Sequence, residues 1–180
     1  MTVYILIPTF NEENNIAELY KNLSENCKTI NTHYLLVDDC SIDKTIELIH
    51  KNFRDEHYII IEKIENLGPS DSFNRGFEWI LNHSAEDKDI IVTMEADNTS
   101  DISILSKMIT ISTLGYSLVL ASVYAQGGGF QKTTLIRKII SFIANMFFRT
   151  FFNIKVLTIS SFYRVYHVSL IREIKKKIPR

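Results

Sequence analysis

Residues 90–101 read IIVTMEADNTSD, and this stretch is the most informative part of the sequence. An apolar run passes directly into closely spaced acids. The run has the composition of a buried strand, and Glu95 and Asp97 follow it with the small residue Ala96 between them. Two carboxylates at the carboxyl end of a strand can hold Mg²⁺ or Mn²⁺ together with a diphosphate, because these ions prefer oxygen ligands. A solvated strand end is the alternative for such a triplet taken alone.

Apolar runs and helical stretches alternate on the amino-terminal side of this segment. Strands are expected at residues 3–8, 34–37, 58–62 and 89–94, and helices at residues 12–26, 43–53 and 70–81. The strand-like runs are continuously apolar, which is typical of a parallel sheet with both faces covered. The pattern therefore predicts a doubly wound, Rossmann-like α/β domain with a mostly parallel sheet, whose ligands bind beyond the carboxyl ends of the strands.

Polar motifs follow the expected strands at the points where the strands end. PTFNEEN occupies residues 8–14 and VDDCSIDKT residues 37–45. Asp38 and Asp39 could accept hydrogen bonds from a ribose or a base edge, and a capping role is the alternative for Asp38, Ser41 and Asp43. Gly68 precedes a helix, where it suits phosphate binding and structural turning equally well.

Composition and cysteine content limit the possible classes of protein. The 180 residues are 46% hydrophobic and 23% charged, which suits one domain with a sizeable core. Cys27 and Cys40 have no paired or metal-binding spacing, so a reduced, cytoplasmic setting is expected. The start MTVYILIPTF lacks the basic region of a signal peptide.

Charge divides the chain into two unlike parts. Residues 1–101 hold 20 Asp and Glu against 8 Lys and Arg, whereas residues 102–172 hold 8 bases and no acid. Such asymmetry predicts an anionic partner for the second part, with a solvated basic face as the alternative.

Residues 134–154 are densely apolar and rich in phenylalanine, with basic residues at both ends. Only ten residues separate Lys138 from Arg149, too few to span a bilayer, which needs about 20. A basic amphipathic helix lying in a membrane interface is therefore expected, and a core helix packed on the sheet is the alternative.

Four motifs in order, PTFNE, VDDCSIDKT, NLGPSDSFNRGF and EAD, resemble the nucleotide-diphospho-sugar transferases of the GT-A fold, in the inverting glycosyltransferase family 2. Residues 121–149, ASVYAQGGGFQKTTLIRKIISFIANMFFR, resemble the acceptor loop and membrane-facing helices of dolichol-phosphate mannosyltransferases and related polyprenyl-phosphate glycosyltransferases. Residues 156–166, VLTISSFYRVY, resemble a further motif of that group.

The resemblance implies roles for individual residues. A nucleotide-sugar pocket would be lined by Pro8, Thr9, Phe10, Glu12, Val37, Asp39, Gly68 and Ala96. Within it, Val37 and Asp39 would meet the base. Glu95, Asp97 and Thr99 would hold the Mg²⁺ or Mn²⁺ ion.

An acceptor site is also implied. Arg137 and Ser141 would bind the acceptor phosphate, and Arg164 would lie near the sugar-phosphate centre, so that Asp97, Arg137 and Arg164 carry the reaction. Five positions depart from the pattern that the resemblance implies. Phe10 stands for a tyrosine, Glu95 for an aspartate, Val123 for an arginine, Thr158 for an aspartate and Phe162 for a glycine.

The resulting expectation is a metal-dependent, inverting enzyme that moves a sugar from GDP-mannose or a UDP-sugar to a membrane polyprenyl or dolichyl phosphate. Residues 1–133 would form the nucleotide-sugar-binding core and residues 134–180 the acceptor part, peripheral on the cytoplasmic face of a membrane, with no nucleic acid as partner. A saccharide acceptor and a catalytically degenerate binding module are the alternatives, and truncation is open because relatives usually continue beyond the position of Arg180.

Overall fold

The computed structural model describes residues 1–84, 86–129, 134–153, 156–159 and 161–178, except for the side chain of Arg137. The chain divides into two compact units: unit 1 is Met1–Val119 with Tyr163–Arg180, and unit 2 is Leu120–Phe162. The division expected at residue 133 concerned function, and it stays a prediction.

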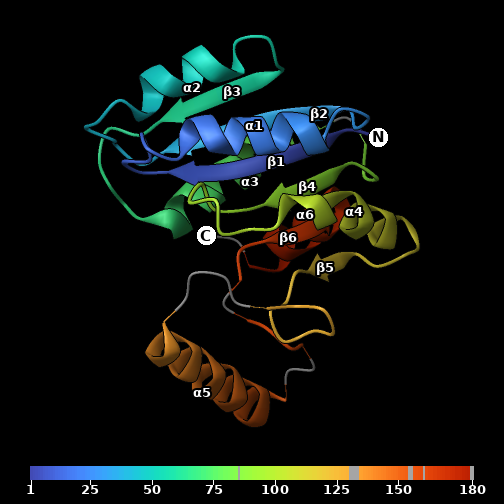
Figure 1. Ribbon diagram of the computed structural model, residues 1–180. Coiled ribbons are helices and arrows are strands. Elements are labelled where there is room, and N and C mark those ends of the chain that lie inside the picture. Colours follow the sequence, from blue (N-terminus) through green and yellow to red (C-terminus); the bar gives the residue numbers. More distant parts are fainter. Residues whose placement is uncertain (85, 130–133, 154–155, 160, 179–180) are drawn as a thin grey trace. The chain divides into compact units, whose positions relative to one another are not determined.

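Unit 1 is built on a mixed sheet with the strand order β3-β2-β1-β4-β6-β5 (Figure 1). The strands are β1 (Val3–Thr9), β2 (Thr32–Asp38), β3 (Tyr58–Glu62), β4 (Ile90–Thr93), β5 (Leu118–Leu120) and β6 (Arg164–His167). β1 pairs in parallel with β2 and β4, β2 pairs in parallel with β3, and β6 is antiparallel to β4. The carboxyl ends of β1 to β4 therefore meet at one edge, which confirms the expected mostly parallel α/β architecture.

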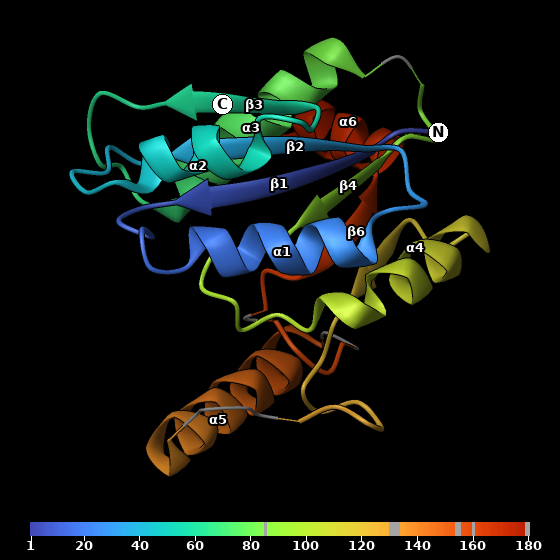
Figure 2. The ribbon, with the colours of Figure 1, turned by 45° about the horizontal axis from the view of Figure 1, so that its top comes forward.

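Helices cover both faces of this sheet (Figure 2). On one face lie α1 (Ile16–Asn26) and α2 (Thr45–Phe53), where Phe53 packs edge-on against Tyr34 of β2 with ring centroids 5.3 Å apart. On the other face, α3 (Pro69–His83) and α6 (Val168–Lys177) share a buried cluster with the alternate side chains of β1 and β2. Successive strand residues point to opposite faces, so the continuous apolar runs fill both cores.

The close packing of α3 on β1 depends on Gly76. A Cβ atom at this position would lie 2.2 Å from Cδ1 of Leu6, well inside van der Waals contact. Any other residue at this position would therefore force the buried side chain of Leu6 to shift.

The carboxyl-terminal elements of unit 1 are found only in the structure. They are the 3₁₀ helix η1 (Ile102–Ile104), α4 (Leu105–Thr113), β5, β6 and α6. The predicted amino-terminal elements are present, although α1 begins at Ile16 rather than at residue 12. The residues before it stay in the loop because their backbone N–H groups bond to the loop after β2.

Unit 2 contains one helix, α5 (Leu135–Phe152), among its described residues. Asn145 is buried on this helix; its Nδ2 donates to the carbonyl of Ser141 at 2.8 Å, and its Oδ1 accepts from the amide of Ile159 at 2.8 Å. The first bond lies within α5, and the second fixes the helix to the segment that follows it. Within the ranges that the structure covers, no helix combines the length and apolar character needed to cross a bilayer.

Candidate functional site

Asp38, the last residue of β2, holds together the edge of the sheet at which the carboxyl ends of β1 to β4 meet. Its Oδ1 accepts hydrogen bonds from Thr9 Oγ1 at 3.0 Å and Ser41 Oγ at 2.6 Å, and its Oδ2 accepts from the amide of Ser41 at 2.8 Å. Both oxygens of this buried carboxylate are therefore used inside the protein. Of the two roles left open for Asp38, the geometry favours the structural one.

The loops after β1 and β2 are bonded to each other along their length. The amide of Glu12 donates to Thr45 Oγ1 at 2.7 Å, and the amide of Glu13 donates to Asp43 Oδ2 at 3.2 Å. Asp43 also accepts from the amide of Thr45 at the start of α2. Burial opposes ionisation of Asp43, but these hydrogen bonds outweigh it and lower the pKa of the carboxyl. The two loops thus form one wall beside the strand ends.

Three residues other than glycine adopt left-handed backbone at this edge. Asn11 (φ 54°) follows β1, Cys40 (φ 66°) follows β2, and Asn98 (φ 56°) follows β4. Such residues cost free energy and persist where surrounding contacts over-determine the backbone, which is common at functional sites. The sharp turns let each loop leave its strand with polar groups exposed at the edge.

Glu95 and Asp97 lie exposed just beyond β4, on either side of the buried Ala96. Oδ1 of Asp97 accepts from the amide of Thr99 at 3.1 Å and from Thr99 Oγ1 at 2.7 Å, which leaves its second oxygen toward solvent. Thr99 therefore orients the carboxylate of Asp97. Whether Thr99 is itself a metal ligand stays a prediction.

Glu12 belongs electrostatically to the same cluster. Partial burial and the negative charges of Asp97 and Glu12 raise the pKa of Glu95. Asn98 Nδ2 donates to the carbonyl of Asn15 at 3.0 Å, and Asn15 Nδ2 donates to Glu12 Oε2 at 2.5 Å, so the loop after β4 is joined to the start of α1.

A divalent cation suits this donor set. Among the residues described, no three His, Cys, Asp or Glu side chains enclose a metal position. Glu95 and Asp97 supply two carboxylates whose mutual repulsion a cation would relieve, and Mg²⁺ or Mn²⁺ commonly takes its remaining ligands from substrate phosphates and water. The two residues therefore fit an ion that is shared with a diphosphate.

Arg164 reaches this edge from a distant part of the chain. It begins β6, where it pairs with Thr93, the last residue of β4, only two positions before Glu95. Its Nη1 donates to the hydroxyl of Tyr166 at 3.5 Å. The antiparallel register of β6 thus brings Arg164 beside the end of β4, which the acidic triplet follows.

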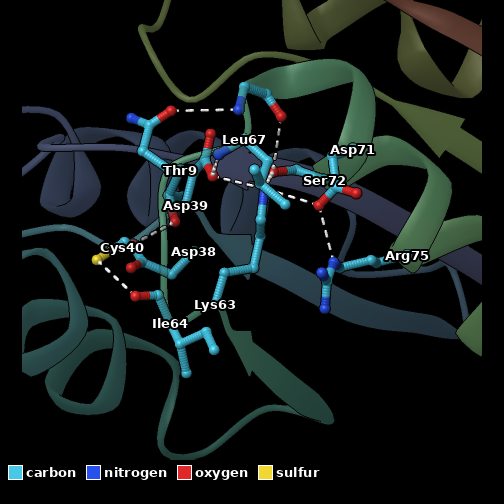
Figure 3. Close-up of polar contacts among 12 residues, drawn as sticks. Thr9, Asp38, Asp39, Cys40, Lys63, Ile64, Leu67, Asp71, Ser72 and Arg75 are labelled. Atoms are coloured by element: carbon cyan, nitrogen blue, oxygen red, sulfur yellow. Dashed lines mark hydrogen bonds and ion pairs between the residues drawn. The ribbon is translucent and has the colours of Figure 1, made fainter.

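Asp39 is held by a buried lysine that the sequence did not single out (Figure 3). Nζ of Lys63 lies 2.5 Å from Asp39 Oδ1 and 2.9 Å from Asp71 Oδ2. Burial opposes the charge of Lys63, but hydrogen bonds and attraction to both carboxylates outweigh it and raise the pKa of the ammonium group. A lysine directly after an expected strand reads as a surface residue, so only a search for a buried countercharge to Asp39 could have found it.

The other expected pocket residues contribute in different ways. Phe10 is 45% exposed beyond β1, whereas the side chain of Val37 is buried in the core cluster, so only the backbone of Val37 can meet a ligand. Gly68 has a φ of 82° and directly precedes α3, and Pro8 and Thr9 end β1. Their contacts with a nucleotide remain predictions.

The expected acceptor residues lie in unit 2. Ser141 Oγ accepts from the hydroxyl of Tyr124 at 3.0 Å, and the side chain of Arg137 lies outside the described residues. Thr158, which stands for the family's aspartate, is buried and bonds through Oγ1 to Ser122 Oγ at 2.6 Å. Thr158 therefore serves the internal packing of this unit.

The fold and the site together define an α/β domain whose polar groups converge at the carboxyl ends of parallel strands. The model of Glycosyl transferase family 2 matches residues 4–175, and the chain belongs to this family. Dolichol-phosphate mannosyltransferase of Pyrococcus furiosus is 28% identical over 141 residues, which are 78% of this chain and 38% of that protein. Polyprenol monophosphomannose synthase of Mycolicibacterium smegmatis is 27% identical over 176 residues, which are 97% of this chain and 63% of that protein. The chain thus spans less than two thirds of either relative.

Solved structures show the same fold. TarS of S. aureus in complex with UDP-GlcNAc superposes with a TM-score of 0.65 at 18% identity, over 97% of this chain and 48% of that one. Glucosyl-3-phosphoglycerate synthase from Mycobacterium tuberculosis, in complex with Mn²⁺, UDP and glucosyl-3-phosphoglycerate, superposes with a TM-score of 0.67 at 15% identity, over 94% of this chain and 57% of that one. These likenesses confirm the expected GT-A fold.

Proposed function

We propose that this chain binds a nucleotide-diphosphate sugar and transfers the sugar, with inversion, to a polyprenyl phosphate at a membrane surface. The observation that carries the proposal is the acidic cluster beyond β4, in which Glu95 and Asp97 act electrostatically on one another and Glu12 adds a third negative charge. Family membership and the two polyprenol-linked mannosyltransferase relatives support the donor and acceptor classes.

The donor would bind with its diphosphate at the acidic triplet and its base beside Asp39. Glu95 and Asp97 would hold Mg²⁺ or Mn²⁺, which when bound neutralises charge that develops on the leaving diphosphate. Arg164, paired with the end of β4, would donate hydrogen bonds to a phosphate oxygen near the sugar. The glycosidic bond to the diphosphate breaks as the acceptor oxygen bonds to the anomeric carbon from the opposite side.

A phosphate acceptor fits the charge of unit 2. No Asp or Glu occurs between Asp101 and Glu173, so this part of the chain offers no carboxylate to deprotonate a sugar hydroxyl. A lipid phosphate is already anionic near neutral pH and needs no general base. Arg137 and Ser141 would hold that phosphate, and correct placement would then account for much of the rate.

A membrane surface fits the side chains of α5. Eleven large apolar residues of this helix are exposed, namely Leu135, Ile136, Ile139, Ile140, Phe142, Ile143, Met146, Phe147, Phe148, Phe151 and Phe152. A helix that exposes apolar side chains on most of its circumference, with basic residues near its ends, suits the boundary between headgroups and acyl chains. These side chains support a peripheral position at a membrane surface, and the cytoplasmic face remains the expectation from the sequence.

The experiment that tests the donor class is a thermal-shift panel of GDP, UDP, GDP-mannose and UDP-sugars, each with Mn²⁺ and with EDTA. We expect one nucleotide series to raise the melting temperature with Mn²⁺ only. Metal-dependent hydrolysis of the same nucleotide sugar would then support an active centre, and radiolabel transfer to undecaprenyl phosphate would support the acceptor. Nucleotide binding without hydrolysis or transfer would instead favour a binding module.

A further inference from the structure

Lys63 lies at the carboxyl end of β3, and its side chain is only 1% exposed. Its ammonium group contacts three oxygens: Asp39 Oδ1 at 2.5 Å, Asp71 Oδ2 at 2.9 Å and Ser72 Oγ at 3.3 Å. Lysine is almost never fully buried unless it is paired, and its three N–H donors are here matched by three acceptors. The residue thus joins the ends of β2 and β3 to the first turn of α3 (Figure 3).

Among the described residues, only one oxygen of the Asp39 carboxylate, Oδ1, has hydrogen-bond partners. Oδ1 accepts from Lys63 Nζ and from the amide of Leu67 at 2.9 Å, and the backbone amide of Asp39 donates to the carbonyl of Thr9 at 2.8 Å. Nothing in the described part of the chain bonds to Oδ2. The carboxylate is therefore fixed in orientation, with one oxygen left as an acceptor at the edge of the sheet where the ligand is expected.

We propose that Lys63 is a positioning residue that fixes Asp39 as an acceptor for the ring N–H of a nucleotide base, so that the site takes uracil or guanine and rejects cytosine and adenine. The inference rests on the proposed function, in which Asp39 faces the base. N3 of uracil and N1 of guanine carry a hydrogen and donate. The corresponding nitrogens of cytosine and adenine carry lone pairs, which would face the lone pairs of Oδ2.

The lysine matters because a buried carboxylate without a positive partner is costly. Such a group binds a proton instead, and a protonated carboxyl can donate a hydrogen bond to the lone pair of cytosine N3 or adenine N1. Removing Lys63 should therefore erase the discrimination between bases while leaving the diphosphate contacts intact. A site that requires a donor from its ligand rejects analogues that lack it, because its own acceptor is then left unpaired.

The test is calorimetric titration of UDP, GDP, CDP and ADP, with Mn²⁺ present, into the wild type and Lys63→Met. The wild type should bind UDP or GDP at least about tenfold more tightly than CDP and ADP, as expected for one decisive hydrogen bond. Lys63→Met should reduce this ratio below about threefold. The affinity for Mn²⁺-pyrophosphate, which has no base, should not change. Lys63→Arg keeps the charge and should restore most of the ratio.

Arg75→Met is the matched control, because Arg75 is a partly exposed base that also contacts Asp71, through Nε at 2.8 Å, and has no bond to Asp39. Its base ratio should equal that of the wild type. If Lys63→Met does not fold, Lys63→Met/Asp71→Asn also removes the second carboxylate that Lys63 contacts, which lowers the excess negative charge, and the base ratio of this double variant is measured instead. The preferred nucleotide methylated at its ring nitrogen (N3-methyl-UDP, or N1-methyl-GDP if GDP is preferred) has no ring N–H and should bind the wild type at least about tenfold more weakly than its parent.

An unchanged base ratio in folded Lys63→Met, or equal binding of the preferred nucleotide and its ring-N-methyl analogue, overturns the inference. Wild-type protein that binds none of the four nucleotides with Mn²⁺ overturns the proposed function itself. The two failures are therefore distinguishable.

Discussion

Thr9 Oγ1 donates a 3.0 Å hydrogen bond to Oδ1 of Asp38, and this buried contact joins the last residues of two neighbouring parallel strands. The same carboxylate orders the next loop through Ser41. The wall of the candidate site is therefore an extension of the core, and a change in Asp38 should affect the whole fold.

Asp38→Ala should lower the free energy of unfolding by about 2–4 kcal/mol, because the hydroxyl of Thr9 and the amide of Ser41 lose their acceptor. Urea denaturation followed by circular dichroism measures this loss. Asp55→Ala is the control: Asp55 is exposed, and within the described residues its carboxylate pairs only with the exposed Arg54, so the change should stay within about 0.5 kcal/mol. Equal losses in the two variants would contradict the structural role of Asp38.

Gly76→Ala should destabilise unit 1 by about 1–3 kcal/mol, because the added Cβ would lie 2.2 Å from a methyl group of Leu6. Gly129→Ala adds the same atom where none of the described residues comes within 4 Å, and it should be nearly neutral. Thermal denaturation compares them. A neutral Gly76→Ala would mean that the side chain of Leu6 can move aside without cost.

Asp97→Asn should raise the dissociation constant for the preferred nucleoside diphosphate about tenfold or more with Mn²⁺, and leave it unchanged with EDTA. The fold should persist, because the asparagine carbonyl still accepts from Thr99. Asp101→Asn is a closely matched control: Asp101 is also exposed and accepts from the amide and hydroxyl of Ser103 in the same way. Calorimetry that finds equal effects would show that general negative charge, and no specific ligand, is responsible.

Glu95→Gln should raise the melting temperature at pH 7 in the absence of metal. The folded protein raises the pKa of Glu95 above its ordinary 4.5, so the favourable contribution of this carboxyl is fully present below pH 4.5 and is lost as the pH rises through the folded value. The advantage of the glutamine variant should therefore vanish near pH 4. Mn²⁺ with nucleotide should stabilise the wild type more than the variant. A melting-temperature difference that is constant with pH would contradict the repulsion among Glu95, Asp97 and Glu12.

The wild type should co-sediment with liposomes that contain anionic lipid, and Arg137→Glu/Lys138→Glu should release it, because the exposed apolar side chains of α5 need basic neighbours for attraction to the headgroups. Lys21→Glu/Lys51→Glu makes the same change in net charge on exposed positions of α1 and α2, and it should remain bound. Wild-type protein that stays in the supernatant at low salt would favour the alternative of a core helix.

Much of unit 1 could be predicted from local sequence. Strands that are buried on both faces have continuous apolar runs, and α1 to α3 each present buried residues at helical spacing, so these elements are visible without knowledge of their partners. The acidic triplet was also predictable as a site, because parallel strands place all their carboxyl ends at one edge.

Tertiary structure alone decided the remaining parts of the site. The four residues of β6 show no periodicity that distinguishes a strand, and Arg164 reaches the end of β4 only through antiparallel pairing with Thr93. Lys63 looks like a solvated lysine beside a strand until Asp39 and Asp71, which follow β2 and begin α3, surround its ammonium group. Local apolar pattern is a property of neighbouring residues, whereas register and the pairing of buried charges depend on segments far apart in the chain. The sequence therefore determined the sheet and where its site would lie, and the fold decided which charges meet there.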